Sequence, residues 1–190
     1  ATSSFAQCLI PPPLESCNGT EPSLLDNETL VVGNKKWYYG APVVYNQVTL
    51  RGGTLVVCGD LTFNNFTMDS GTIVIRPGAR LRLVQGAGII LRGNSSIYNH
   101  GTFECTTNLS LDPNWATPAK PNVVINATPA SVFKMSNQYF TINNANSFFV
   151  NRGRAEFWGL ITDYGAGAGS VCLGRLSESR GGSGADRLCR

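Results

Sequence analysis

Few side chains in this sequence have the types and spacings needed for catalysis. The chain contains a single histidine, His100, which lies in the turn-like run Asn99-His100-Gly101. A histidine-based hydrolase would also need a nearby nucleophile and a carboxylate, and the Gly-x-Ser-x-Gly nucleophile elbow does not occur. We therefore interpret His100 as a solvated turn residue rather than as a general base.

Carboxylates offer the next possible chemistry, because polysaccharide-cleaving enzymes use pairs of them. Glu104 and Glu156 follow the turn glycines Gly101 and Gly153 at the same interval, so they could form a pair on one face of the fold. The alternative is that both are solvated, outward-facing residues. A glycan-binding groove on this chain would combine acidic and aromatic side chains, namely Glu104, Glu156, Asp163, Trp158 and Tyr164.

A small basic stripe is also predicted. Arg80 and Arg82 alternate with Leu81 and Leu83, so both arginines should point outward from a strand. The stripe could contact acidic glycans, or it could simply solvate a sheet face and discourage edge pairing. Its members would be Arg76, Arg80, Arg82 and Arg92.

The six cysteines show no Cys-x-x-Cys pair, and one histidine cannot complete a Cys/His zinc site. An even count without metal spacing favours an oxidising compartment with disulfides, and the alternative is a set of buried free thiols. No Asp-rich calcium loop occurs. The sequence therefore predicts no metal and no cofactor, and no catalytic residue is assigned.

Two disulfides would each close a short loop near one end of the chain, Cys8–Cys17 and Cys172–Cys189. Cys58 and Cys105 instead lie within the repetitive part of the sequence, at least two expected turns of the chain apart. Two strand spacings would separate their α-carbons by roughly 10 Å, which is beyond disulfide reach. We expect these two cysteines not to bond to each other.

Composition limits the class of protein. The 190 residues suit one domain, only 14% are charged, and the net charge is +3. Such a small, scattered charge does not suggest nucleic-acid binding, which needs a concentrated basic face. No run of about 18 or more apolar residues occurs, so we expect no membrane-spanning segment. The start at Ala1, without a charged and then apolar leader, is what a processed, secreted chain would show.

A repeat organises the sequence between Thr54 and Leu111. Three similar lines, 54–63, 72–83 and 88–98, begin at nearly constant intervals, and each reads as a strand, a tight turn and a second strand. Self-similarity at such a short period is typical of a solenoid, in which each unit buries its apolar face against the next. In this alignment five apolar residues fall in the same strand of successive lines, namely Val56, Ile73, Ile75, Ile89 and Leu91.

Asparagines recur downstream at a longer period. Asn99, Asn126 and Asn151 are almost evenly spaced, at a wider interval than the lines upstream, and each follows two apolar residues. Turn asparagines that adopt the left-handed conformation could stack as an amide ladder, or they could be unrelated. Six Asn-x-Ser/Thr sequons permit glycosylation in a host that performs it, and they start at Asn18, Asn27, Asn65, Asn94, Asn108 and Asn126.

The organisation that we expect is a β-solenoid over residues 30–174 between two irregular ends. Residues 1–29 would form an N-terminal cap or docking segment, and residues 175–190 an Arg/Gly-rich tail. Residues 112–121 hold three prolines and read as a loop outside the solenoid, with Trp115 as a lid or as a contact for a partner.

The repeated lines and the Asn-x-Gly turns resemble secreted bacterial surface proteins with a right-handed parallel β-helix. The resemblance is to the pectin-lyase-like and filamentous-adhesin-like group, and most to surface proteins of Bacteroidota. It implies an all-β, right-handed parallel β-helix at the cell surface. Larger members of this group include lyases, whereas short ones are often adhesive or structural. This chain lacks the acidic clusters at matched positions that the lyases carry.

The resulting expectation is a non-enzymatic, extracellular structural or adhesive protein. Exposed strand edges at the two ends of a solenoid favour head-to-tail association, so the partners would be further copies or other surface proteins. The alternative is a carbohydrate-active enzyme or a glycan-binding module. Ice binding would need regular threonine columns, at which Thr54, Thr72 and Thr102 only hint.

Overall fold

The computed structural model describes residues 11–84, 88–111, 122–136, 139–142, 147–163, 171–173 and 176–179, and these residues are all-β. The strands are β1 (Glu28–Val31), β2 (Lys35–Tyr38), β3 (Val43–Val57), β4 (Asp60–Ile75), β5 (Arg80–Leu83), β6 (Ile89–Leu91), β7 (Ser95–Asn99), β8 (Thr102–Cys105), β9 (Leu109–Leu111), β10 (Val123–Asn126), β11 (Val132–Met135), β12 (Tyr139–Ile142), β13 (Phe148–Asn151), β14 (Arg154–Phe157), β15 (Leu160–Asp163), β16 (Val171–Leu173) and β17 (Leu176–Ser179).

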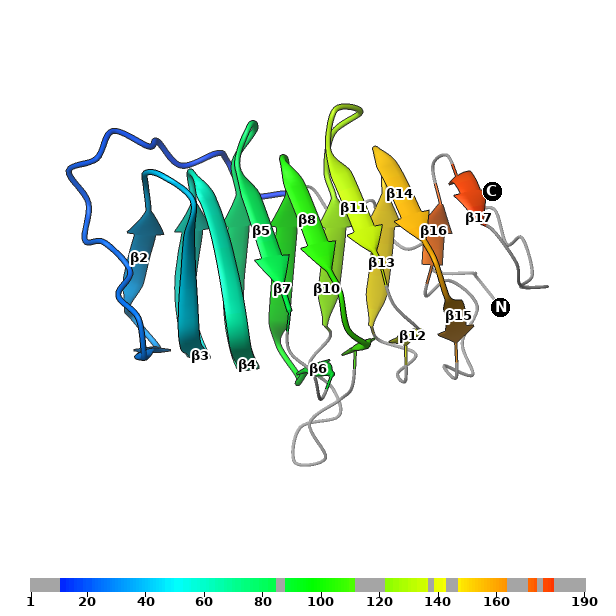
Figure 1. Cartoon of the computed structure of the whole chain (residues 1–190), viewed down its shortest axis with the longest axis horizontal. Helices are drawn as coiled ribbons and strands as arrows, with labels where there is room; N and C mark the ends of the chain where they lie inside the picture. The colour runs from blue at the N-terminus through cyan, green and yellow to red at the C-terminus, as the bar shows by residue number, and fades with distance from the viewer. Residues whose placement is uncertain are drawn as a thin grey trace, which may run out of the picture.

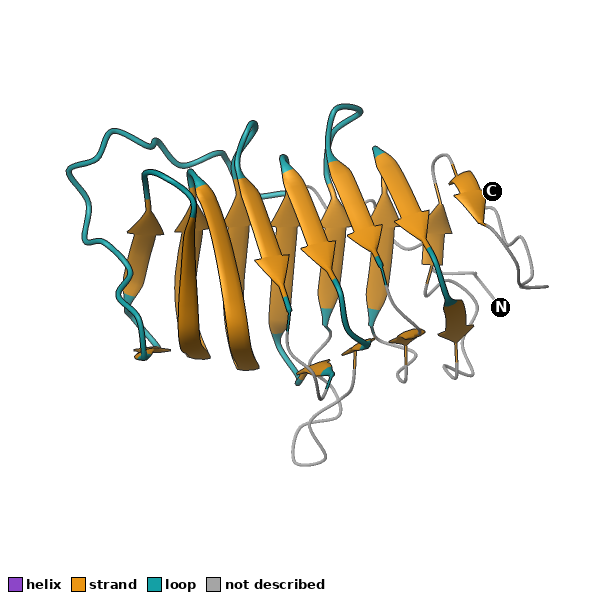
Figure 2. Ribbon diagram, in the orientation of Figure 1, coloured by secondary structure: helices purple, strands orange, loops and turns teal. Residues whose placement is uncertain are grey.

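The chain winds repeatedly through three parallel sheets, so the predicted β-solenoid is confirmed (Figure 1 and Figure 2). Sheet 1 contains β2, residues 54–57 of β3, residues 72–75 of β4, β7, β10, β13 and β16. Sheet 2 contains residues 43–45 of β3, residues 60–63 of β4, β5, β8, β11, β14 and β17. Sheet 3 contains β1, residues 48–51 of β3, residues 66–70 of β4, β6, β9, β12 and β15.

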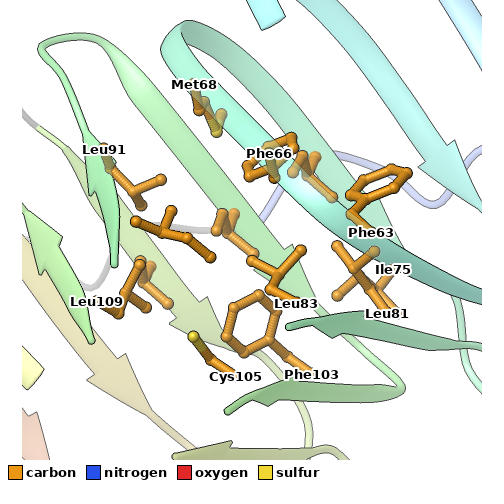
Figure 3. Close-up of a cluster of buried hydrophobic side chains, with 14 of the residues drawn as sticks. Phe63, Phe66, Met68, Ile75, Leu81, Leu83, Leu91, Phe103, Cys105 and Leu109 are labelled. Carbon is orange, nitrogen blue, oxygen red and sulfur yellow. The ribbon is translucent and has the colours of Figure 1, made fainter. Parts of the chain in front are cut away.

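The core lies between the three sheets and runs along the stack. In each strand every second residue points inward, because successive side chains alternate across a strand. The register of neighbouring strands then stacks similar side chains on one another, as in the fully buried pair Phe103 and Phe133 on sheet 2. Figure 3 shows the interior where the sheets meet, with Leu83 of sheet 2 and Leu91 of sheet 3 among the buried side chains.

The predicted alignment of the three repeated lines is correct for the first two lines and wrong for the third. Thr54 and Thr72 are register partners, as the alignment of the first two lines predicts. The next partner of Thr72 is Ser96, however, and Ile89 belongs to sheet 3. The prediction that five apolar residues fall in the same strand is therefore correct for Val56, Ile73 and Ile75 and wrong for Ile89 and Leu91. Apolar alternation looks the same in all three sheets, so the sequence pattern cannot say which sheet a strand joins.

The longer repeat that the asparagine spacing predicts downstream is confirmed. Asn99, Asn126 and Asn151 are successive register partners on sheet 1, so the interval between neighbouring asparagines is one full turn of the solenoid. The turn that links Thr54 to Thr72 is shorter than either of these two. The turns thus lengthen from 18 residues between Thr54 and Thr72 to 27 between Asn99 and Asn126, and then shorten to 22 between Phe149 and Val171.

The residues just before β1 cover β2, the first strand of sheet 1, through a short stretch of β-type pairing. Ser23 pairs with Trp37, and the amide of Leu24 donates to the Trp37 carbonyl at 2.7 Å. Leu24 is fully buried and joins the main core. The residues before β1 therefore close the sheet 1 side of the stack, as terminal repeats of solenoids generally do.

The disulfide of this region differs from the expected one. Cys17 bonds to Cys58, with α-carbons 6.0 Å apart, so the predicted Cys8–Cys17 bridge is wrong. Cys58 directly follows β3 at the corner between sheets 1 and 2, where the N-terminal segment passes. Closing a loop with a sequence separation of 41 removes about 4 kcal/mol of unfolded-state entropy in the chain-entropy model. Cys105 is a free, buried thiol, which confirms that it does not bond to Cys58.

Several predicted features lie outside the described residues, namely Cys8, the loop 112–121 with Trp115, Tyr164 and Cys189. The proposed Cys172–Cys189 bridge is among them, because only one of its positions belongs to a described strand. Within the described ranges there is no helix that could cross a membrane.

Candidate functional site

The most densely charged surface of the described residues is the outer face of sheet 2. Register stacks Arg82, Glu104, Lys134 and Glu156 in one column, so that positive and negative side chains alternate from strand to strand. Arg82 Nε lies 3.6 Å from one Glu104 oxygen, and Lys134 Nζ lies 3.9 Å from the other. The carboxylate of Glu104 is thus held between two cations.

A second set of ion pairs flanks this column. Arg80 donates to both oxygens of Asp60 at 2.9 and 2.8 Å, and this contact raises the pKa of the Arg80 guanidinium. Arg154 Nε lies 2.8 Å from Glu156 on the same strand. Such partly exposed pairs contribute about 0.2–1 kcal/mol each, so their main effect is to neutralise the face.

Glu104 and Glu156 share one face, as predicted, but they are not an open carboxylate pair. Two strand spacings, roughly 10 Å, separate their backbones, and Lys134 occupies the position between them. Lys134 was missed at the sequence level, although the alternation Val132-Phe133-Lys134-Met135 matches Thr102-Phe103-Glu104-Cys105.

The predicted groove residues are not brought together on one sheet. Asp163 ends β15 of sheet 3, in register with the buried residue Ile142, whereas the two glutamates belong to sheet 2. Trp158 follows β14 at the corner between sheets 2 and 3 and is 65% exposed. Among the described members of the predicted groove, the two glutamates and Asp163 therefore belong to different sheets.

The basic stripe is only partly as predicted. Arg80 and Arg82 do point outward from sheet 2, and the alternating residues Leu81 and Leu83 are fully buried. Arg92 instead follows β6 on sheet 3 and pairs with Asp69 at 3.1 Å. The fourth member, Arg76, lies at the corner that follows β4. A continuous stripe is therefore absent among these four residues, because the chain turns between them.

His100 is buried, and the prediction of a solvated residue is wrong. It lies at the corner between sheets 1 and 2, where its amide donates to the Ile75 carbonyl at 2.9 Å. Only 8% of the residue is exposed, and neither ring nitrogen has a hydrogen-bond partner. Burial lowers the pKa of His100 below its ordinary value, and the positive charge of Arg76 lowers it further.

Acidification should therefore destabilise the fold through His100. Because the folded-state pKa is lowered, the unfolded chain binds the proton first, and stability falls as pH drops below the ordinary value of about 6.5. We expect the urea midpoint to fall between pH 7.5 and 5.5, and to fall less in His100→Asn. NMR titration of this single histidine checks the cause directly. A pKa at or above 6.5 in the folded protein would contradict it.

The predicted asparagine ladder is confirmed, and it is buried. Asn99 Nδ2 donates to Asn126 Oδ1 at 2.8 Å, and Asn126 Nδ2 donates to Asn151 Oδ1 at 2.7 Å. The same Nδ2 groups reach the Val132 and Arg154 carbonyls at the start of sheet 2. The ladder thus joins sheet 1 to sheet 2 at their shared corner.

The backbone of the ladder differs from expectation. Its asparagines end strands β7, β10 and β13, and the positive-φ asparagines of the described chain are Asn27 and Asn94 instead. Burial also removes one sequon from consideration, because Asn126 has no exposed surface to carry a glycan. The other five sequon asparagines, Asn18, Asn27, Asn65, Asn94 and Asn108, are all exposed.

The thiol of Cys105, the free cysteine of the described residues, is unreactive because it is buried. Cys105 points into the core of sheet 2, and burial raises the pKa of its thiol to about 12. Its thiol donates to the Thr107 carbonyl at 3.3 Å. A protonated, buried thiol is a poor nucleophile and a poor metal ligand. No cluster of three or more potential metal ligands occurs among the described residues.

Comparison of the chain with protein-family models, with curated proteins and with solved structures found no match.

Proposed function

We propose that this protein is a non-enzymatic structural or adhesive rod that acts outside the cell. The observation that carries the proposal is the outer face of sheet 2, where each carboxylate of the charged column has a basic neighbour in contact. A glycosidase needs one carboxylate as an acid and a second as a nucleophile or base, and Lys134 stands between Glu104 and Glu156. The Cys17–Cys58 disulfide is consistent with an oxidising compartment such as the cell exterior.

The first turn offers a site for end-to-end association. Among the described strands β1 pairs only with β3, so its other edge has backbone groups available for a further strand. Exposed apolar side chains surround that edge, with Val31 47%, Val32 81% and Leu25 62% exposed. A head-to-tail contact at such an edge does not close on itself and would build a filament. The resemblance to Bacteroidota surface adhesins supports this assembly and a cell-surface location.

Light scattering coupled to size-exclusion chromatography, with electron microscopy of the same samples, tests the proposal. We expect concentration-dependent linear assemblies, and at least about tenfold weaker association in Val32→Glu, because a charge at a strand edge opposes pairing. Ile90→Glu is the matched control, since Ile90 is 43% exposed on β6, a strand that already pairs with β4 and β9. A chain that stays monomeric at every concentration would refute the filament.

A glycan-binding module is the second candidate, favoured by two exposed aromatic rings at one corner. Trp158 follows β14 of sheet 2, and Tyr139, which is 45% exposed, begins β12 of sheet 3. Exposed aromatic rings are common contacts for ligands with one apolar face. A change in tryptophan fluorescence on adding a soluble polysaccharide, lost in Trp158→Ala, would favour this candidate over a purely structural role.

A further inference from the structure

The charged column on the outer face of sheet 2 is self-complementary. Along the stack it reads Arg82, Glu104, Lys134 and Glu156, so the sign of the charge alternates from each strand to the next. A two-fold axis perpendicular to the sheet, between Glu104 and Lys134, reverses this order. In a second copy turned about that axis, each cation of the column therefore faces a carboxylate of the first copy, and each carboxylate faces a cation.

The ion pairs within one copy do not use the full binding capacity of the two cations. The distances from Arg82 Nε and Lys134 Nζ to the Glu104 oxygens, 3.6 and 3.9 Å, are longer than hydrogen bonds. The buried Nε of Arg82 has no hydrogen-bond partner. The side chains of Arg82 and Lys134 are 42% and 36% exposed. Both cations can therefore accept a further anionic group that approaches from outside the sheet.

The spacing of the strands fixes how two such faces can align. Strands β5, β8, β11 and β14 lie side by side in the row nearest the viewer in Figure 1. Neighbouring strands are about 4.8 Å apart in both copies, so aligning one pair of opposite charges aligns all of them. A shift of the axis by one strand toward β4 would instead place Lys134 opposite Thr62, which is uncharged. The position between β8 and β11 is thus the one that the charges favour.

The same two-fold relation brings an exposed aromatic ring opposite a cation. Trp158 lies two residues after Glu156 and Arg80 lies two residues before Arg82, so they flank the charged column on opposite sides. Rotation about the axis exchanges these two sides and the strands β5 and β14. Trp158 is 65% exposed and the Arg80 side chain 46%. A guanidinium group against an indole ring is a favourable contact, so a second copy would cover a ring that one copy leaves in water.

We propose that the outer face of sheet 2 is a lateral contact between two copies of this chain, which lie side by side in opposite directions. A face of four short strands measures roughly 19 Å by 13 Å, on the order of 250 Å² per copy. A standard interface buries about 800 Å² per partner, so the isolated pair is weakly bound. The contact goes beyond the proposed end-to-end assembly and does not depend on it, because it needs only two single rods.

Sedimentation equilibrium of the full-length Val32→Glu chain tests the lateral contact, because that substitution opposes end-to-end association and leaves sheet 2 unchanged. We expect a monomer–dimer equilibrium with a dissociation constant below about 1 mM at low ionic strength. Salt at about 0.5 M should weaken dimerisation at least about tenfold, because it screens exposed charges.

Charge reversal in the same background tests the two-fold arrangement. Glu104→Lys should weaken dimerisation at least about tenfold, because it places like charges opposite each other twice, once for each copy. Lys134→Glu should weaken it as much for the same reason. The double variant Glu104→Lys/Lys134→Glu makes these charges opposite again and should restore dimerisation to within about threefold of the starting chain. Asp69→Lys on sheet 3 is the matched control, since it changes the net charge as Glu104→Lys does, and it should leave dimerisation unchanged.

Two results would overturn the inference. A chain with unchanged sheet 2 that stays monomeric at about 1 mM and low ionic strength would show that the lateral contact does not form. Opposite effects of the two single reversals would show that association follows net charge rather than the alternation along the column. The first result does not require that a charge-reversed chain fold. Failure of the proposed filament is recognised separately, because it appears as the absence of linear assemblies from the wild-type chain.

Discussion

Replacing Asn126 with aspartate is expected to lower the free energy of unfolding by about 3–5 kcal/mol at pH 7. Asn126 is fully buried, and its Nδ2 donates to Asn151 Oδ1 at 2.7 Å and to the Arg154 carbonyl at 3.0 Å. Aspartate replaces this donor with a negatively charged acceptor that faces those two oxygens. The variant therefore loses two buried hydrogen bonds and gains an uncompensated charge.

The pH dependence of the variant identifies the cause. Burial and the facing oxygens raise the pKa of the new carboxyl in the folded state, so the folded chain takes up a proton before the unfolded chain does. The loss of stability should therefore shrink as the pH is lowered from 7 to 5, whereas His100 makes the wild-type protein less stable over the same range. Urea unfolding followed by circular dichroism at both pH values measures this.

Asn94→Asp is the matched control for this substitution. Asn94 is exposed and has a φ of 69°, a conformation that aspartate tolerates nearly as well as asparagine. We expect a change within about 0.5 kcal/mol for this variant. A loss below about 1 kcal/mol for Asn126→Asp would mean that the ladder does not hold the corner together.

The ladder shows how far local sequence can lead in this fold. Nearly equal spacing after two apolar residues was enough to predict that Asn99, Asn126 and Asn151 stack, because a solenoid repeats each environment once per turn. Their strand-end backbone was not predictable, since asparagine is common in turns and uncommon in strands. The amide partners on sheet 2 depend on how the corner folds, and that geometry is not encoded in residue spacing.

The candidate site was harder to predict than the fold. That Glu104 and Glu156 share a face follows from their matched positions after turn glycines. That Lys134 stands between them requires the register of β11, a strand with no glycine turn before it. The Cys17–Cys58 bond likewise depends on where the irregular N-terminal segment runs, and a local Cys8–Cys17 loop was the simpler pattern.

The burial of His100 illustrates the same limit. A histidine between asparagine and glycine has the composition of an exposed turn, yet the corner residues of successive turns stack on one another as closely as the strands do. Gly101 makes this packing visible, because a Cβ there would lie 2.3 Å from the carbonyl oxygens of Arg76 and Ala79. A corner this tight has no room for a side chain at position 101, and it also excludes water from the neighbouring ring.

Replacing Phe133 with alanine should cost about 3–5 kcal/mol, the range observed for buried aromatic residues. Phe133 is fully buried on β11, and its ring centre lies 5.0 Å from that of Phe103 and 4.8 Å from that of Phe149. Phe140 and Phe157 complete the cluster, each 5.8 Å away. The substitution removes the one ring that contacts all four others and leaves a cavity that rigid sheets cannot close.

The strands that Phe133→Ala destabilises are as informative as the total loss of stability. Each turn of a solenoid contacts only its neighbours, so the loss should spread from β11 to β8 and β14 more than to β3 and β4. Hydrogen exchange should accordingly rise in those three strands first, while calorimetry records the drop in melting temperature. Phe148→Ala is the control, because Phe148 is only partly buried and packs on the outer cluster of sheet 1. Equal loss of protection along the entire stack would show instead that the solenoid unfolds as a single cooperative unit, in which case a defect anywhere along it would weaken both ends.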